Sequence, residues 1–294
     1  MTVHLSDWLA LREPADAAAR SDSLTRTITD VVAPCDPVRV LDLATGTGAN
    51  LRYLVERLPP RQDWLVTDVD SHLLVRLRER TSSWAATRGY AVEEHQGGLM
   101  IRGERLDCRV AVRQLDLNTL PIEIFSGRHL VTSSALLDLV SEPWLRALAQ
   151  RCRAERAAAL FALNYDGRSV CSPAEPEDDV LRDALNRHQL NDKGLGGPAA
   201  GPDADRIALR VFEEAGYRAL SEEANWNLGT GETELQRQLM EGWAEAALEL
   251  EPALAGSIAS WRVRRFAHLA AGRSSIVVGH HDVAAWLYAG RVVR

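Results

Sequence analysis

Along most of this chain, short apolar runs alternate with amphipathic stretches, and this alternation constrains the fold more than any other feature of the sequence. The apolar runs predict strands at 38–43, 64–67, 109–115, 129–132, 157–163, 217–220 and 275–278. Apolar residues at helical spacing predict helices between them, of which 47–58, 71–87 and 142–153 are the clearest. This order predicts an α/β protein with a doubly wound, seven-stranded and mostly parallel sheet.

Polar residues follow the predicted strands at the points where the strands end. They are Asp42, Asp68, Asp116, the pair Ser133 and Ser134, and Asn164. Ligands of open α/β sheets bind outside the carboxyl ends of the strands. The sequence therefore predicts a ligand site at this edge, with those side chains around it.

The loop after the first strand reads D-L-A-T-G-T-G and runs from Asp42 to Gly48. Its glycines have no Cβ, and the helix that follows offers free N–H groups to a ligand. A dinucleotide site would need a glycine where Leu51 stands, and Asp42 would repel a pyrophosphate. A ligand with a cationic amino group fits Asp42 better.

With T-D-V-D at 67–70 and Q-L-D-L at 114–117, this loop resembles the motifs of class I S-adenosylmethionine-dependent methyltransferases. The resemblance covers roughly residues 36–165, and the strands near 217–228 and 274–281 follow in suitable order. It implies a Rossmann-like fold whose last strand is antiparallel, S-adenosyl-L-methionine as cofactor, and an enzyme that transfers a methyl group in line.

By position, the resemblance implies that Asp42 lies near the amino group of the methionine moiety. Gly46 and Gly48 would let the backbone approach the cofactor. Ala44, in place of a usual glycine, and Thr45 complete the cofactor loop.

The later motifs complete the implied cofactor site. Asp68 would accept hydrogen bonds from the ribose hydroxyls. Asp116 would accept one from the adenine amino group, with Leu117 packed nearby. Ser133 and Ser134 would form the floor at the methionine end.

The rest of the chain predicts a helical cap over a core at 31–165 and 203–228. Its parts are an N-terminal helical lid at 1–30 and insertions at 166–202 and 229–272, and the last strand and C-terminal tail occupy 273–294. In the lid, Trp8, Arg12, Asp16 and Arg20 are spaced four apart on one helical face. Arg12 could bind the cofactor carboxylate, and a surface ladder of ion pairs explains the same spacing.

Three residues are candidates for catalysis. Asp138 follows the fourth strand, and a structural ion pair or a helix cap would also explain it. Tyr165 leaves the fifth strand in N-Y-D-G, where simple packing is the alternative. His188 lies in the polar stretch N-R-H-Q-L-N-D-K-G, and a solvated helix end explains it equally.

No metal site is predicted, although His280, His281 and Asp282 stand together. The antiparallel last strand that the resemblance implies would carry its C-terminal end away from the cofactor, so a structural role is favoured. The formal charge of −7 argues against a nucleic-acid partner. Without an 18-residue apolar run or a signal peptide, and with four scattered cysteines, the sequence predicts a cytoplasmic protein without a membrane partner.

The sequence thus predicts methyl transfer to oxygen or nitrogen of a small metabolite. A protein or RNA substrate and a non-catalytic, cofactor-binding regulatory module remain alternatives, and a nicotinamide dehydrogenase is disfavoured by Asp42 and Leu51. The oligomeric state does not follow from the sequence.

Overall fold

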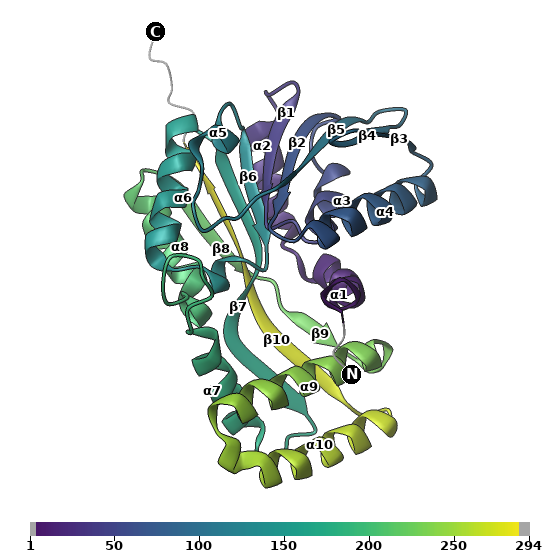
Figure 1. Cartoon of the computed structure of the whole chain (residues 1–294), viewed down its shortest axis with the longest axis vertical. Coiled ribbons are helices and arrows are strands. Elements are labelled where there is room, and N and C mark those ends of the chain that lie inside the picture. Colours follow the sequence, from purple (N-terminus) through teal and green to yellow (C-terminus); the bar gives the residue numbers. More distant parts are fainter. Residues whose placement is uncertain (1–3, 288–294) are drawn as a thin grey trace.

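The structure is a computed structural model that describes residues 4–287. An α/β body carries a smaller group of helices at the carboxyl ends of its central strands, and the N-terminal helix lies between the two parts (Figure 1). The body holds the predicted ligand edge, so this arrangement decides what surrounds that edge.

One ten-stranded sheet forms the centre of the body, in the order β3-β4-β5-β2-β1-β6-β7-β10-β8 with β9 paired to β10. The strands are β1 (Val38–Leu43), β2 (Arg61–Asp68), β3 (Ala91–His95), β4 (Gly98–Arg102), β5 (Asp107–Gln114), β6 (Leu130–Ser134), β7 (Ala158–Ser172), β8 (Arg218–Glu223), β9 (Trp226–Leu228) and β10 (Ser275–Trp286). Strands β5, β2, β1, β6 and β7 are parallel, and β10 is antiparallel to both β7 and β8. The predicted α/β class is confirmed, as is the antiparallel last strand.

The strand number differs from the predicted seven because a hairpin, β3–β4, and the short β9 join the sheet. Four of the five residues of β3 are exposed, so its sequence carries no apolar pattern from which a strand could be predicted. The hairpin turns at Gly97, whose φ is +98°.

Helices cover both faces of the sheet. One face carries α2 (Asp22–Val32), α3 (Ala49–Val55) and α4 (Ser71–Thr87), and the other carries α5 (Ile122–Phe125), α6 (Glu142–Glu155) and α8 (Ala204–Glu214). Val38 and Val40 of β1 pack toward the first group, whereas Leu41 and Leu43 pack toward the second. Because side chains alternate along a strand, one apolar run serves both layers.

Local sequence signals fix where two of these helices begin. Asp70 caps α4, since its carboxylate accepts a hydrogen bond from the N–H of His72 at 2.8 Å. Ser141 caps α6 through the N–H of Trp144, and Pro143 occupies the first turn.

The predicted lid at 1–30 comprises two helices with different roles. Leu24, Ile28 and Val32 of α2 are buried in the core of the body. Only α1 (Leu5–Ala19) stands over the edge of the sheet (Figure 1). The stripe of apolar residues four apart explains why α2 joins the core.

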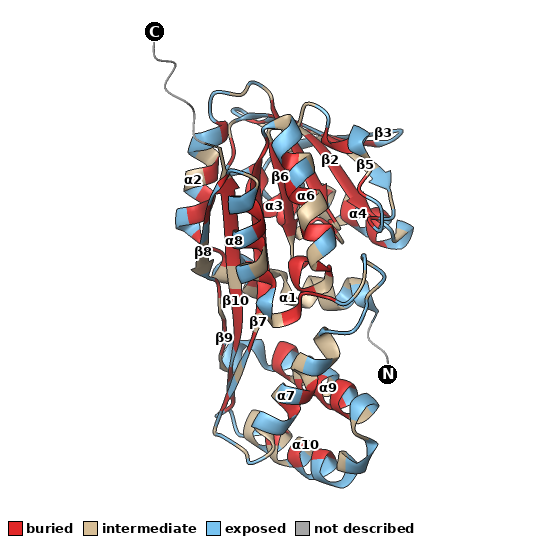
Figure 2. Ribbon diagram, turned by 90° about the vertical axis from the view of Figure 1, so that its left-hand side faces the viewer, coloured by how far each residue is buried: buried red, intermediate tan, exposed pale blue. Residues whose placement is uncertain are grey.

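The cap consists of α7 (Asp178–Gln189), α9 (Thr233–Leu250) and α10 (Ala255–Ala270), which share an apolar core with the ends of β7 and β10. Their buried faces turn toward one another, as Figure 2 shows. Strand β7 continues to Ser172, past the predicted end of the core at residue 165. The strand part of the predicted segment 273–294 is β10, and residues 288–294 of its tail lie outside the described residues.

Within residues 4–287, no helix combines the length and the apolar character that crossing a membrane requires.

A buried ion pair holds α7 against α10. The Arg265 side chain is fully buried, and its guanidinium binds Asp178 and donates to the carbonyl of Pro173 at 2.6 Å. Asp178→Ala should lower the free energy of unfolding by about 3–5 kcal/mol, because it leaves a buried charge without its partner. Chemical denaturation measures this loss.

The neighbouring Asp179→Ala is the matched control, since the Asp179 side chain is 79% exposed in its pair with Arg182. It should change the unfolding free energy by less than about 0.5 kcal/mol. Equal, small effects of both substitutions would contradict the structural role of Asp178.

Candidate functional site

The carboxylate of Asp42 is fully buried, and both of its oxygens accept hydrogen bonds. The Thr45 hydroxyl donates to one oxygen at 2.6 Å, and the Asn50 side-chain amide donates to the other at 2.7 Å. Burial raises the pKa of the Asp42 carboxyl to about 6. Asp42 therefore ties the end of β1 to the glycine loop and to the first turn of α3.

Gly46 and Gly48 have φ values of +56° and +84°, in the left-handed region that favours glycine. A Cβ on Gly48 would lie 2.9 Å from Cγ of Leu77, and one on Gly46 would lie 3.1 Å from Cδ1 of Leu9. The glycines thus let α4 and α1 pack directly on the loop. Ala44 also has a positive φ, of 50°.

Asp68 braces the same loop from the end of β2. One of its oxygens accepts a hydrogen bond from the N–H of Gly46 at 2.8 Å, and the other accepts from the N–H of Asp70 at 3.0 Å. Burial raises the pKa of the Asp68 carboxyl. Asp42 and Asp68 therefore hold the glycine loop between them.

The other predicted cofactor residues lie along the same edge. Asp116 is exposed, two residues after β5, and one of its oxygens accepts from the N–H of Asn118. Leu117 is buried, and its carbonyl accepts from the indole N–H of Trp144 at 2.7 Å. Ser133 is fully buried, and its hydroxyl has no hydrogen-bond partner among the described residues.

A buried polar network that the sequence did not reveal continues from Asp42. Asn50 accepts a hydrogen bond from Arg20 at 2.9 Å, and Nε of Arg20 lies 3.4 Å from the carboxylate of Asp282. Asp282 also accepts from the N–H groups of Ser21 and Leu163, at 2.9 and 2.8 Å. Two features of the sequence could have indicated this network. Asn50 stands two residues after the glycine motif, and Arg20 is a charged residue on the helical face of the predicted lid.

Asp138 differs from the other buried carboxylates of this edge. It lies in a short 3₁₀ turn after β6, is 6% exposed, and has one oxygen without a hydrogen bond among the described residues. Burial raises the pKa of its carboxyl to about 6, although Arg12 and Lys193 lower it. Asp138 is therefore the buried acid with a free proton-accepting position.

A row of ring contacts runs from Tyr165 through His280 to Trp226. The Tyr165 hydroxyl donates to the side-chain oxygen of Asn186 at 2.9 Å, and its ring centroid lies 6.2 Å from that of His280. The His280 ring lies 4.9 Å from Trp226, and burial lowers the pKa of His280 to about 3, so the imidazole is neutral.

The place of His280 differs from the sequence prediction. Strand β10 begins at Ser275 and is twelve residues long, so His280 and His281 lie level with Tyr165 and Asn164 at the ligand edge. The C-terminal end of β10 does lie at the opposite edge, but these residues are in its middle. Among residues 4–287 there is no group of three or more metal-binding side chains.

Two further candidates have partners within the chain. Nε2 of His188 lies 3.1 Å from Glu249 of α9, so His188 joins two cap helices. Arg12 donates to Asp16 at 2.9 Å and lies 5.2 Å from the Trp226 ring. That His188 acts as a base and that Arg12 binds a cofactor carboxylate both stay predictions.

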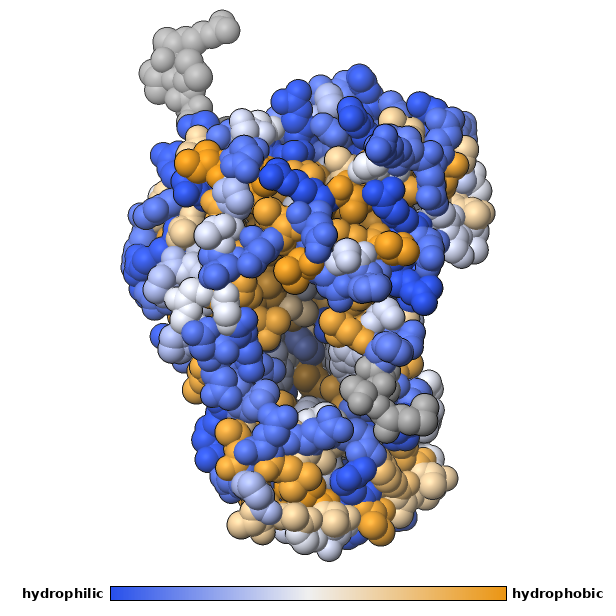
Figure 3. Space-filling model, viewed as in Figure 1, coloured by the Kyte–Doolittle hydropathy of each residue, from blue (hydrophilic) through white to orange (hydrophobic). Residues whose placement is uncertain are grey.

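The surface is hollowed between the body and the cap. Figure 3 shows this hollow where β7 and β10 pass from one part to the other in Figure 1.

Comparison with known proteins gives matches among solved structures alone. No family model and no curated protein matches the sequence. A methyltransferase from Geobacter sulfurreducens in complex with S-adenosyl-L-homocysteine matches 96% of this chain and 99% of its own, with 14% identity and a TM-score of 0.45. The cyclopropane synthase MmaA2 from Mycobacterium tuberculosis matches 95% and 93%, with 10% identity and a TM-score of 0.46. Similarity at this level does not assign a function to the chain.

The raised pKa of Asp138 has a consequence for stability. The native carboxyl binds its proton up to about pH 6, whereas an unfolded aspartate loses it near pH 4. Asp138 therefore contributes stability at low pH that is lost as the pH rises through 6. Asp138→Asn should remove this loss and raise the unfolding free energy at pH 7 by roughly 1–3 kcal/mol.

Denaturation at pH 5 and pH 7 measures the effect, with the exposed Asp179→Asn as control. A variant that loses stability with pH as steeply as the wild type would show that Asp138 is not the titrating group.

Proposed function

We propose that this chain is an S-adenosylmethionine-dependent methyltransferase that acts on oxygen or nitrogen of a small metabolite. One observation carries the proposal: the adjacent parallel strands β1, β2 and β5 bring Asp42, Asp68 and Asp116 to one edge, around a glycine loop that opens α3. This is the order in which the resemblance expects the groups that receive the methionine, ribose and adenine parts of the cofactor.

The polar groups of the edge fit such a cofactor. The buried hydroxyls of Ser133 and Thr47 lack partners among the described residues, and a bound polar ligand would provide them. Asp116 is exposed and keeps an oxygen for a donor. When bound, the cofactor supplies an electrophilic methyl group on a sulfonium.

The chain itself has to hold an acceptor close to that methyl group, exclude water and remove a proton. Proximity and alignment supply most of the rate in an in-line transfer. Asp138 is the group that we assign to the proton, because its free oxygen and its pKa near 6 suit a base at neutral pH. Tyr165 and the neutral His280 would form the wall beside it.

The enclosure favours a small acceptor over a polymer. Helix α1 closes on β9 beside the hollow, since Trp8, Arg12 and Asp16 all contact Trp226. The proposed location is the cytoplasm, in keeping with four cysteines that are all free.

The cofactor is tested by calorimetric titration with S-adenosylmethionine, S-adenosylhomocysteine and NADH. We expect micromolar binding of the two sulfur compounds and none of NADH. Asp116→Ala should weaken S-adenosylhomocysteine about tenfold, roughly 1–2 kcal/mol, because it removes a charged acceptor and leaves the glycine loop in place.

Asp36→Ala is the matched control, an exposed carboxylate that pairs with Arg61 near the start of β1. Equal affinity of the Asp116 and Asp36 variants, or binding of NADH alone, would overturn the cofactor assignment.

Turnover is tested by a screen of a metabolite extract for acceptors of a labelled methyl group. For the acceptor found, kcat should rise about tenfold per pH unit below pH 6 and level off above it, since Asp138 must be deprotonated. Asp138→Asn should lower kcat by about 10²–10⁴-fold and leave S-adenosylhomocysteine affinity unchanged.

Cofactor binding without any methyl transfer would favour the regulatory module instead. An Asp138→Asn enzyme with the wild-type pH profile would remove Asp138 from catalysis.

A further inference from the structure

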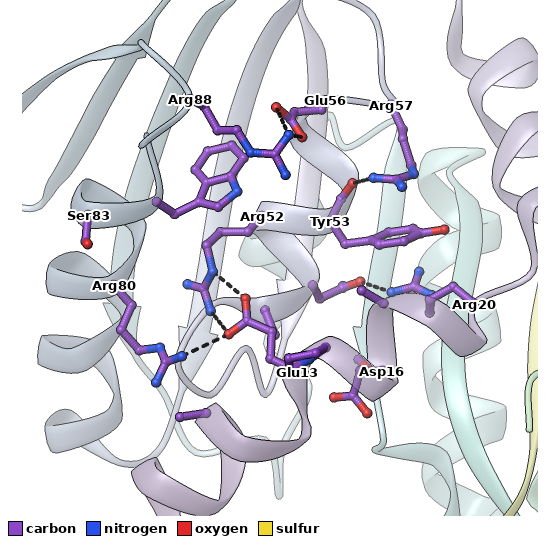
Figure 4. Close-up of a pocket in the computed structure, with 17 residues that line it drawn as sticks. Glu13, Asp16, Arg20, Arg52, Tyr53, Glu56, Arg57, Arg80, Ser83 and Arg88 are labelled. Carbon is purple, nitrogen blue, oxygen red and sulfur yellow. Dashed lines mark hydrogen bonds and ion pairs between the residues drawn. The ribbon is translucent and has the colours of Figure 1, made fainter. Parts of the chain in front are cut away.

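A cavity of about 600 Å³ lies between α1, α3 and α4, and arginines are the commonest charged residues of its lining. Five arginines reach it, namely Arg20, Arg52, Arg57, Arg80 and Arg88 (Figure 4). The whole chain has a formal charge of −7, so this concentration of positive charge is local. The cofactor and base assigned above leave the mouth of this cavity unexplained.

The carboxylates of the lining do not balance these arginines. Glu13 of α1 binds Arg52 through both oxygens, at 2.7 and 2.6 Å, and also Arg80 at 3.2 Å. Glu56 lies 3.1 Å from Arg88. The third carboxylate, Asp16, accepts from Arg12 and Trp226, outside this set of arginines.

Two of the five arginines lack a carboxylate within the lining. Arg57 donates to the carbonyl of Tyr53 at 2.7 Å, lies 3.8 Å from the Tyr53 ring, and has no ion pair among the described residues. Arg20 lies 4.4 Å from the same ring and has its acid, Asp282, behind it at 3.4 Å. The Tyr53 ring is thus held between two guanidinium groups (Figure 4).

Arg20 also has an unsatisfied donor buried beside the cavity. Arg20 is 7% exposed, and its Nη2 has no hydrogen-bond partner among residues 4–287. A buried charged donor without an acceptor is costly, and an anionic ligand would remove that cost. Nε of Arg80 likewise has no partner there.

We propose that this cavity binds a small organic anion with at least two acid groups, phosphate or carboxylate. One acid group would lie on Arg57, which has no acid partner, and another on Arg80 and Arg88 at the mouth, because planar guanidinium groups bind both kinds of acid in a bidentate way. Tyr53, Trp84 and the small residues of α1 provide an apolar surface for the organic part.

Glu13 acts as an internal competitor for this ligand. Its carboxylate binds the guanidinium groups of Arg52 and Arg80, and an acid group of the ligand would bind to groups of the same kind. Removing the Glu13 charge should tighten anion binding, whereas removing an arginine should weaken it. Because any change of net charge would shift anion binding in the same directions, a matched arginine outside the cavity is needed to show that the effects belong to this site.

Calorimetric titration with inorganic pyrophosphate and with citrate, at ionic strength matched with sodium chloride, tests the proposal. We expect saturable binding of at least one probe, and the preferred probe tells phosphate from carboxylate ligands. Arg57→Gln and Arg80→Gln should each weaken it about fivefold, and Glu13→Gln should tighten it about threefold. Arg76→Gln on α4 is the matched control, since Arg76 is exposed, pairs with Glu79 and lies outside the lining.

Absence of saturable binding of both probes, or equal affinities of the Arg57, Arg80 and Arg76 variants, would overturn the proposal. If Glu13→Gln fails to fold, the two arginine variants still decide. The inner end of the cavity is lined by Asn50 and Ser134, so S-adenosylhomocysteine is titrated with pyrophosphate present. Full mutual exclusion of the two ligands would place the anion in the cofactor site and overturn a separate site.

Discussion

The buried carboxylate of Asp282 joins three parts of the chain that lie far apart in the sequence. It accepts hydrogen bonds from the N–H of Ser21, 261 residues away, and from the N–H of Leu163 in β7, and it balances the charge of Arg20. Ser21 lies in the turn between α1 and α2. Because Asp282 holds this turn, it also fixes the direction in which α1 leaves the body. The closure of the ligand edge by α1 depends on it.

From Asp282 the same network reaches the glycine loop. Arg20 donates to Asn50, Asn50 donates to Asp42, and Asp42 holds Thr45. Every one of these side chains is at least nine-tenths buried, so each group relies on the next for its hydrogen bonds. The position of α1 and the shape of the glycine loop are therefore coupled. A shift in either would break a buried hydrogen bond that water does not replace.

The central sheet and the helices on it were predictable because they rest on local pattern. Helix α4, Ser71–Thr87, has the same bounds as the helix predicted at 71–87. The hairpin β3–β4 was not predictable, because its outer strand is exposed and has no apolar period. The full length of β10 was not predictable either, because Gly279, His280 and Asp282 interrupt its apolar run. His280 and Asp282 have hydrogen-bond partners far away in the chain.

For the site, sequence reasoning found the strand-end acids but had no means to tell which of their oxygens stay free. In Asp42 and Asp68, both carboxylate oxygens accept hydrogen bonds from the loop or the residues next to it. The folded structure shows that one carboxylate oxygen of Asp138 accepts none from the described residues. The same distinction separates the arginines, because Arg52 is fully engaged while Arg20 retains a free donor. A buried polar group without a hydrogen-bond partner destabilises the folded chain. A ligand or a proton that pairs with such a group removes this destabilisation, so these groups are candidate binding sites. By this criterion Asp138 marks where chemistry is to be sought, and the arginine cluster around Arg20 marks where further binding is.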